Sequence, residues 1–335
     1  MRSAGRVASS PGRVTLIGEH TDYNEGCSIG VATPWRTTVI ASEGDRGFIE
    51  VESAALGRAR CSLARPSGPP FVVLAAALAS ATGVDGARLE VASELPVGAG
   101  LSSSAAFAVA VALALGFEGD ALSVARVCQR AERAAGADVG LLDQLVVLRA
   151  REGVAVDVDF SDLSVETPLV PENIGLTVVD TGVRRDVSSS DYAARRAECA
   201  AAAQVIGPLG RASIDDLSAL DDELLVRRAR HVVGECARVR AARAALAGAD
   251  LEALGAIIDE GHASLRDDFD VSTSRVEVIR DAVRTLTGVV GARLVGAGFG
   301  GCLVVAHDPE VPVAWHETWA ARLFPSTGAR VTAER

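Results

Sequence analysis

The sequence contains no lysine: all 33 positions that carry lysine or arginine are arginine. A P-loop ends in Gly-Lys-Ser or Gly-Lys-Thr, and protein kinases place a strand lysine on the nucleotide phosphates. Both classes of enzyme are therefore excluded. Runs of basic residues are also missing, and the net charge is -11. Because nucleic acids and anionic membranes are bound through a positive field, neither is expected as a partner.

Two further absences concern the cellular compartment. No uninterrupted apolar run approaches the roughly 18 residues of a membrane span, and residues 1–10 are polar, with no apolar secretory segment. The six cysteines include no Cys-x-x-Cys pair. A chain of this size does not need disulfides to fold, so we expect reduced thiols and a cytoplasmic protein.

The composition is that of a globular protein, because 49% of the 335 residues are hydrophobic and 23% are charged. The patterns predict strands at 14–17, 37–41, 48–52, 88–91, 154–159, 175–180, 293–295 and 302–306. They predict helices at 71–82, 105–115, 123–135, 191–206, 221–247 and 251–264, and a loop at 58–70. Strands and helices are mixed without a regular βαβ rhythm, so we expect an α+β protein with domains at 1–180 and 181–335.

The first unusual segment is Pro-Gly-Arg-Val-Thr-Leu-Ile-Gly-Glu-His-Thr-Asp-Tyr-Asn at residues 11–24. It places Arg13, Glu19, His20 and Asp22 within ten residues, directly after a predicted strand. Charged residues most often form an ordinary polar surface loop. Sugar hydroxyls both donate and accept hydrogen bonds, however, and carboxylates with an imidazole suit them. The mixture therefore favours a sugar-binding loop.

The second segment is Gly-Ala-Gly-Leu-Ser-Ser-Ser-Ala-Ala at residues 98–106. Glycines let the backbone close around phosphates, and a helix N-terminus favours anions. A serine that only caps the helix is the simpler explanation. Three consecutive serines exceed what a cap requires, so we interpret the segment as a phosphate-binding turn.

The third segment is Gly-Ala-Gly-Phe-Gly-Gly-Cys at residues 296–302. It fits the Gly-x-Gly-x-x-Gly pattern of dinucleotide-binding folds. Too few residues follow it to complete a doubly wound sheet, and it opens no convincing helix. The dinucleotide interpretation is therefore rejected, and a glycine-rich hairpin is expected if the segment is taken alone.

Taken together and in this order, the three segments resemble those of the galactokinase family, within the GHMP kinases of small molecules. Gly-Leu-Leu-Asp-Gln at 140–144 is similar to the family segment with the catalytic aspartate, and residues 183–196 are similar to the segment with a sugar-contacting tyrosine. The resemblance spans essentially the whole chain. The chain departs from it mainly by being shorter between Gly57 and Arg88, where a tryptophan normally packs near the nucleotide base; Phe71 is the nearest aromatic residue.

The resemblance implies a role for individual residues. Asp143 would be the catalytic base and Arg13 its positive neighbour. The sugar would be held by Arg13, Glu19, His20, Asp22, Gly140, Asp143 and Tyr192. The ATP phosphates would be cradled by Gly98, Gly100, Leu101, Ser102, Ser103 and Ser104. Mg²⁺ would be bound by Ser104 and Glu132.

The fold implied is the two-domain GHMP kinase fold, with an N-terminal domain similar to domain 2 of ribosomal protein S5 and a ferredoxin-like C-terminal domain. The activity implied is ATP-dependent phosphorylation of the anomeric hydroxyl of galactose. Another sugar, such as arabinose, galactosamine or a uronic acid, stays open as the substrate, and a non-catalytic sugar sensor is a weaker alternative. We expect a monomer or a weak homodimer.

Overall fold

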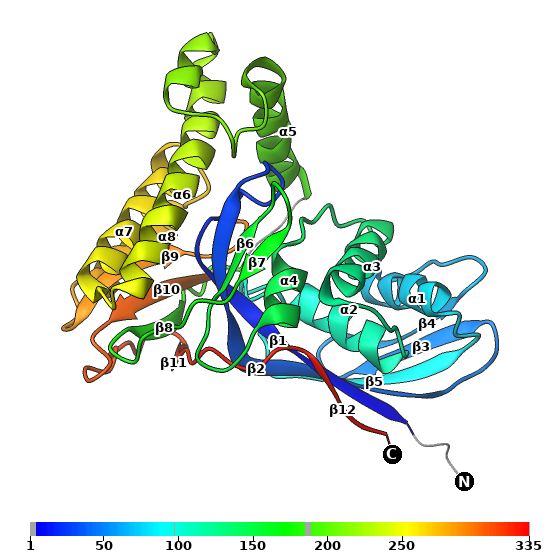
Figure 1. The fold of residues 1–335 in the computed structure, drawn as a ribbon. Coiled ribbons are helices and arrows are strands. Elements are labelled where there is room, and N and C mark those ends of the chain that lie inside the picture. The colour runs from blue at the N-terminus through cyan, green and yellow to red at the C-terminus, as the bar shows by residue number, and fades with distance from the viewer. Residues whose placement is uncertain (1–4, 97, 185–188, 335) are drawn as a thin grey trace.

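The computed structural model describes residues 5–96, 98–184 and 189–334, which form two sheets and their helices (Figure 1). The first sheet has eight strands among these residues, in the order β12-β1-β2-β5-β3-β4, with β6 on β2 and β7 on β6. All neighbours are antiparallel except β3 and β5. Its strands are β1 (Arg6–Ile17), β2 (Cys27–Glu43), β3 (Phe48–Ser53), β4 (Gly57–Ser62), β5 (Ala87–Ser93), β6 (Val156–Asp159), β7 (Ser164–Glu166) and β12 (Arg330–Glu334).

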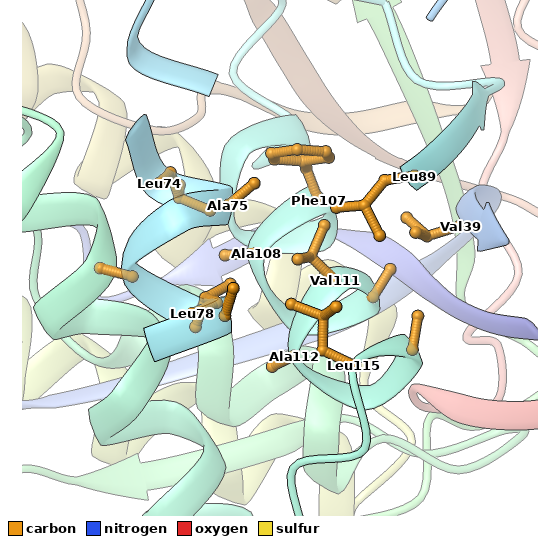
Figure 2. Packing of buried hydrophobic residues seen from close by; sticks show 14 of the residues in the cluster. Val39, Leu74, Ala75, Leu78, Leu89, Phe107, Ala108, Val111, Ala112 and Leu115 are labelled. Atoms are coloured by element: carbon orange, nitrogen blue, oxygen red, sulfur yellow. The ribbon is translucent and has the colours of Figure 1, made fainter. Parts of the chain in front are cut away.

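Four helices cover one face of this sheet (Figure 1). They are α1 (Pro70–Thr82), α2 (Ser103–Ala114), α3 (Ala121–Ala134) and α4 (Leu142–Arg149). Helix α2 is apolar almost all round, so it can be stable only where it is buried on all sides. Phe107 and Val111 of α2 lie toward Leu89 of the sheet, and its other side meets Leu74 and Leu78 of α1 (Figure 2). This packing holds α2, and with it the turn at its N-terminus.

The second sheet has four antiparallel strands among the described residues, in the order β11-β8-β10-β9. They are β8 (Gly175–Asp180), β9 (Val289–Leu294), β10 (Cys302–His307) and β11 (Ala320–Arg322). The helices of this half are α5 (Ser189–Ile206), α6 (Glu223–Ala247), α7 (Leu251–Asp267) and α8 (Ser274–Arg284), with a short 3₁₀ turn η1 (Asp215–Ala219). Asp222, Asp250 and Thr273 cap α6, α7 and α8 through their side chains.

The α+β class is confirmed, and the predicted helices are all present with shifts of a few residues at their ends. The glycine segment at 296–301 joins the antiparallel strands β9 and β10, as the rejection of a dinucleotide fold requires. The loop predicted at 58–70 is wrong in part, because strand β4 pairs with β3 there. Helices α4 and α8 and strands β7, β11 and β12 were not predicted. Within the ranges described, no helix is long and apolar enough to cross a membrane.

The chain passes between the two sheets at other points than residue 180. Strand β8 precedes that residue but pairs with β10 and β11, in the second sheet. Strand β12 lies at the far end of the chain but pairs with β1, in the first sheet, so the first and last strands lie side by side (Figure 1). A domain boundary at 180 stays a prediction, and these two strands do not follow it.

Candidate active site

Each sheet with its helices forms one half of the molecule. A cavity of about 640 Å³ lies where the two halves meet. Its walls come from the end of β1, the turn before α2, the loop before α4, the start of α5 and the loop after β9. The lining includes twelve of the site residues expected from the sequence: Arg13, Glu19, His20, Asp22, Gly98, Gly100, Ser102, Ser103, Ser104, Gly140, Asp143 and Tyr192.

Two expected residues do not line the cavity. The side chain of Leu101 is packed in the hydrophobic core, and its carbonyl accepts a hydrogen bond from the backbone of Arg13. Glu132 is buried behind Ser104. Phe71, the aromatic residue nearest the shortened segment, packs against the core of the first half and does not line the cavity either.

An ion pair between Arg13 and Asp143 lies at the centre of the lining. Arg13 contacts Asp143 Oδ1 through Nε at 2.8 Å and through Nη2 at 2.6 Å, and donates from Nη1 to the Gly100 carbonyl at 2.8 Å. The Ser102 hydroxyl donates to Asp143 Oδ2 at 2.5 Å. Burial by itself would lower the pKa of Arg13, but Asp143 and Glu19 raise it above its ordinary value. Arg13 therefore stays charged although it is only 6% exposed.

The turn before α2 contains three left-handed residues in five positions: Gly98 at φ 75°, Gly100 at 80° and Ser102 at 57°. A left-handed serine costs on the order of 1 kcal/mol, which its bond to Asp143 helps to offset. Ser102 occupies the N-cap position, yet no side chain caps the helix. The capping interpretation is therefore wrong, and the helix N-terminus faces the cavity without a side-chain acceptor of its own.

Ser104 and Glu132 are in contact, as expected from the sequence. The Ser104 hydroxyl donates to Glu132 Oε1 at 2.7 Å, and Gln144 donates to Glu132 Oε2. Burial raises the pKa of Glu132 to about 7, while the hydroxyl of Ser104 lowers it. In the described part of the chain no basic side chain pairs with Glu132. A buried carboxylate with only neutral partners, next to a hydroxyl, suits a hard cation.

The loop that follows β1 holds its shape through its own polar side chains. Thr21 Oγ1 lies 2.9 and 2.7 Å from the carbonyl oxygens of Gly18 and Cys27, either of which can accept its proton, and the Asn24 amide donates to the carbonyl of His20 at 2.8 Å. His20 adopts a left-handed φ of 65°. These contacts fix the loop so that Glu19, His20 and Asp22 reach one cavity.

Of the two carboxylates of this loop, Glu19 is buried and Asp22 is partly buried. Burial raises the pKa of Glu19 to about 7, against the lowering effects of Arg13 and Arg293. Burial and the nearby Asp143 raise the pKa of Asp22 to about 6. Both groups are therefore poised to gain or lose a proton near neutral pH.

Gly140 and Tyr192 complete the wall around this loop. A Cβ atom on Gly140 would lie 1.6 Å from Asp22 Oδ2, so only glycine fits beside that carboxylate. The ring of Tyr192 lies 5.8 Å from that of His20, centroid to centroid, and 5.9 Å from that of Tyr23. Residues 185–188 of the segment containing Tyr192 lie outside the described residues.

Sequence reasoning missed Tyr23 and Asp138 of the cavity lining, and Arg196, which contacts both but does not line the cavity. The Tyr23 hydroxyl forms a hydrogen bond with His20 Nδ1 at 2.9 Å, and Asp138 forms an ion pair with Arg196 at 3.0 Å. The guanidinium of Arg196 lies 4.5 Å from the centre of the Tyr23 ring. Tyr23 belongs to the first polar segment and could have been included; Asp138 and Arg196 come together only through tertiary packing.

Family models match three stretches of the chain. Residues 2–43 match the galactokinase galactose-binding signature, residues 71–151 the N-terminal domain of GHMP kinases and residues 242–315 their C-terminal domain. The first covers the loop with Glu19 and Asp22, and the second covers the turn before α2 and Asp143.

Whole-chain comparisons agree with these matches. The chain is 39% identical to a galactokinase of Streptomyces coelicolor, over 97% of this chain and 93% of that protein. It is 35% identical to the human galactokinase, over 89% and 82%. The crystal structure of Lactococcus lactis galactokinase complexed with galactose is 25% identical, with a TM-score of 0.89 over 98% of this chain and 95% of that one. A mevalonate kinase, at 15% identity and a TM-score of 0.65, shares the fold.

Proposed function

Because the chain belongs to the galactokinase family of the GHMP kinases, we propose that it transfers the γ-phosphoryl group of ATP to the anomeric hydroxyl of galactose. The products are galactose 1-phosphate and ADP. The observation that carries this proposal is the Arg13–Asp143 pair, which lies between the glycine–serine turn and the polar loop after β1.

Asp143 acts as the proton acceptor. A carboxylate has about four lone-pair sites. Arg13 uses Nε and Nη2 on Oδ1, and Ser102 occupies one site on Oδ2. One site on Oδ2 is left for the sugar hydroxyl. The hydroxyl proton passes to this oxygen as the anomeric oxygen bonds to the γ-phosphorus and the bond to ADP breaks.

The charges around Asp143 favour this step. The arginine beside it does not titrate in proteins, so a permanent positive charge faces the Asp143 carboxylate. The same guanidinium stabilises negative charge that develops on the transferred group. Glu19, His20, Asp22 and Tyr192 hold the hydroxyls of the sugar, and the backbone of the turn at Gly98 and Gly100, with the hydroxyls of Ser103 and Ser104, holds the phosphates.

Ser104 and Glu132 are the residues that would hold Mg²⁺. Their hydroxyl and carboxylate oxygens match the ligands that this cation prefers, and Glu132 lacks a basic partner among the described residues. Mg²⁺ held there would supply positive charge to offset that of the phosphates. Gln144 orients the second oxygen of Glu132, so the carboxylate is fixed before any cation arrives.

We also propose that the protein works in the cytoplasm as a monomer or weak homodimer. All six cysteines are buried and free, which is consistent with a reducing compartment. Light scattering coupled to gel filtration, at two protein concentrations, distinguishes the two assembly states.

The experiment that tests the proposed function is an ADP-release assay with MgATP over a panel of sugars. Galactose is expected to give turnover, and arabinose, galactosamine, galacturonic acid and glucose test the alternatives. Phosphorus NMR of the product then shows whether the phosphate is on the anomeric oxygen. Turnover with another sugar alone would replace galactose as the substrate, and galactose binding without any ADP release would indicate a sensor.

A further inference from the structure

A buried ion pair lies directly behind the polar loop after β1, which contains Glu19, His20 and Asp22. Glu235 of α6 and Arg293 of β9 are both 0% exposed, and Arg293 Nη1 lies 2.8 Å from Glu235 Oε1. Neither residue lines the cavity. Isolated charges are costly to bury, and a buried pair often adds little to stability compared with apolar residues of the same size. The pair therefore needs an explanation other than stability.

Glu235 holds the backbone where the chain leaves the first sheet. β1 ends at Ile17, so the next two N–H groups have no strand partner. Glu235 Oε1 accepts from the N–H of Gly18 at 2.9 Å and from that of Glu19 at 3.3 Å. One turn earlier on α6, His231 Nε2 lies 3.1 Å from the carbonyl oxygen of Glu19. Helix α6 thus holds Glu19 by both backbone polar groups.

The side chain of Glu19 is held by the segment that follows β9, the strand that carries Arg293. Glu19 Oε1 accepts from the N–H of Gly296 at 2.6 Å, two residues after the end of β9. Arg293 lies on β9 three residues earlier, and its charge acts on Glu19. A Cβ atom on Gly261 of α7 would lie 2.7 Å from Arg293 Nη1, so α7 leaves room for the guanidinium at that position.

Arg293 does not connect neighbouring elements through hydrogen bonds. Within the described ranges, none of its three guanidinium nitrogens has a partner in hydrogen-bonding geometry, although Nη1 is close to Glu235. Arginines that serve to tie elements together usually form bidentate hydrogen bonds with a carboxylate. The contribution of Arg293 is therefore its charge, placed in a dry region beside two carboxylates.

We propose that Glu235 and Arg293 are positioning residues of the sugar reaction: Glu235 fixes the backbone of Glu19, and Arg293 places a positive charge near the Glu19 carboxylate in the cavity wall. The inference rests on the proposed function, because it assigns Glu19 to the sugar. Neither Glu235 nor Arg293 contacts the substrate. Together they determine the position and the electrostatic surroundings of Glu19, which does contact it.

The surroundings of Glu19 give the sign of the expected pH effects. The charged or titratable groups that face it are Arg13 (β1), Asp22 (its own loop), Asp143 (α4), His231 and Glu235 (α6) and Arg293 (β9). Burial lowers the pKa of His231 to about 4, so its imidazole is neutral in the working range. Burial would raise the pKa of Glu235, but Arg293 and Arg238 lower it well below its ordinary value. Arg293 therefore acts on Glu19 with part of its charge already neutralised.

Two substitutions should move the pH profile in opposite directions. Arg293→Met removes a positive charge near Glu19, so the acidic limb of kcat/KM for galactose should move up by on the order of one pH unit. Glu235→Gln keeps an oxygen acceptor for the backbone but frees the full charge of Arg293, so the limb should move down. Arg293→Lys restores the charge and should return the limb toward that of the wild type.

Glu235→Ala tests the positioning of the backbone. It should raise the KM for galactose about tenfold or more while the KM for ATP changes less than about twofold, since only the sugar loop loses its anchor. Arg243→Met is the matched control. Arg243 also lies on α6, and the substitution breaks its ion pair with the buried Asp157, outside the cavity lining. It should leave the galactose KM and the acidic limb unchanged.

The measurements are kcat/KM from pH 5.5 to 9, galactose binding by calorimetry without nucleotide, and thermal melts to confirm folding. If Glu235→Ala does not fold, Glu235→Gln and Arg293→Lys still decide the charge effect. If Arg293→Met and Glu235→Gln both fold and neither shifts the acidic limb of the pH profile, this inference is overturned while the proposed function stands. A wild-type protein that neither binds nor phosphorylates galactose overturns the proposed function, and the inference with it.

Discussion

Single residues in the cavity carry charges that have been taken out of water. Arg13 and Glu19 are 6% and 3% exposed, and each has an oppositely charged group nearby. In such surroundings, electrostatic interactions are stronger than in water and charged partners stay fixed during the reaction. One atom added or removed should therefore change catalysis much more than it changes folding.

Asp143→Asn removes the proton acceptor while keeping the size of the side chain. We expect kcat to fall roughly 100-fold or more, with a nearly normal thermal melt, because Asp143 is partly exposed and an amide oxygen can still accept from Arg13. The matched control is Asp157→Asn, which weakens the buried pair with Arg243 away from the cavity lining. It should lower the melting temperature and leave kcat unchanged; near-normal turnover of Asp143→Asn would remove Asp143 from its proposed role.

Gly140→Ala should act on the sugar alone. The new methyl group would lie 1.6 Å from Asp22 Oδ2, so the carboxylate must move. Forced overpacking costs about 1–3 kcal/mol, which corresponds to a rise of roughly 5- to 150-fold in the KM for galactose. Steady-state kinetics should show an unchanged KM for ATP. Gly248→Ala, where the nearest atom is 3.4 Å away, is the control and should match the wild type.

The residues that sequence reasoning identified are those within short segments. Glu19, His20 and Asp22 stand almost side by side in the chain, so their common purpose is visible without a structure. Ser102 was expected to hold phosphate, but its contact with Asp143 spans 41 residues. The contact of Glu235 with Gly18 spans 217 residues. No local pattern encodes such contacts, because they arise from the way the elements pack.

At the scale of elements, α2 and α3 bring the cation-binding pair together. Ser104 is in the first turn of α2 and Glu132 is near the end of α3, and the two helices pack against each other. Because α2 is apolar, it is buried in the centre of the first half, and this burial fixes the position of its N-terminus. The position of Ser104 is thus a consequence of the hydrophobic packing of the turns of α2 that follow it (Figure 2).

Ser104→Ala and Glu132→Gln should each raise the Mg²⁺ concentration for half-maximal rate roughly tenfold or more, because the first removes a hydroxyl ligand and the second removes the negative charge of the carboxylate. The ligand carboxylate must be ionised, and burial raises the pKa of Glu132 to about 7. Half-saturation by Mg²⁺ should therefore require more Mg²⁺ as the pH falls below about 7. Titrations of the rate at pH 6 and 8 measure this dependence, which Glu132→Gln should abolish.

A different result would support a structural role. If Ser104→Ala lowers the melting temperature and leaves the Mg²⁺ dependence unchanged, Ser104 only stabilises the contact between the two helices. Measuring the melt and the titration on the same protein separates the two roles.

Elements with strong local signals were predicted from the sequence, and weaker ones were not. Helix α1 ends at Gly83, which is left-handed at φ 73°, as the glycine there predicts. Strands β11 and β12 have three and five residues, and their partners lie far away in the sequence. Helix α4 carries Asp143 but has little amphipathic pattern, since most of its residues are buried. Such elements are defined by their neighbours more than by their own residues.

At the scale of the whole molecule, the cavity belongs to both halves. Arg13, Asp143 and the turn before α2 come from the first half, while Tyr192 and Gly296 come from the second. The chain also crosses between the sheets at β8 and returns at β12. A ligand in the cavity contacts both halves at once, so its binding should stabilise the fold as a whole.

Galactose should therefore raise the melting temperature, and glucose, which differs only at the 4-hydroxyl, should raise it much less. A site built to bond a hydroxyl rejects an epimer strongly, because its buried polar groups are then left unpaired. At a galactose concentration 100 times its Kd, the expected stabilisation is about 2.7 kcal/mol. Asp22→Ala should reduce the shift with galactose and erode the preference over glucose in kcat/KM. Glu25→Ala, three residues further along and paired with Arg211 outside the cavity lining, should retain both. Equal shifts and equal kcat/KM for the two sugars would show that the polar loop does not select galactose, even if the Arg13–Asp143 pair still transfers phosphate.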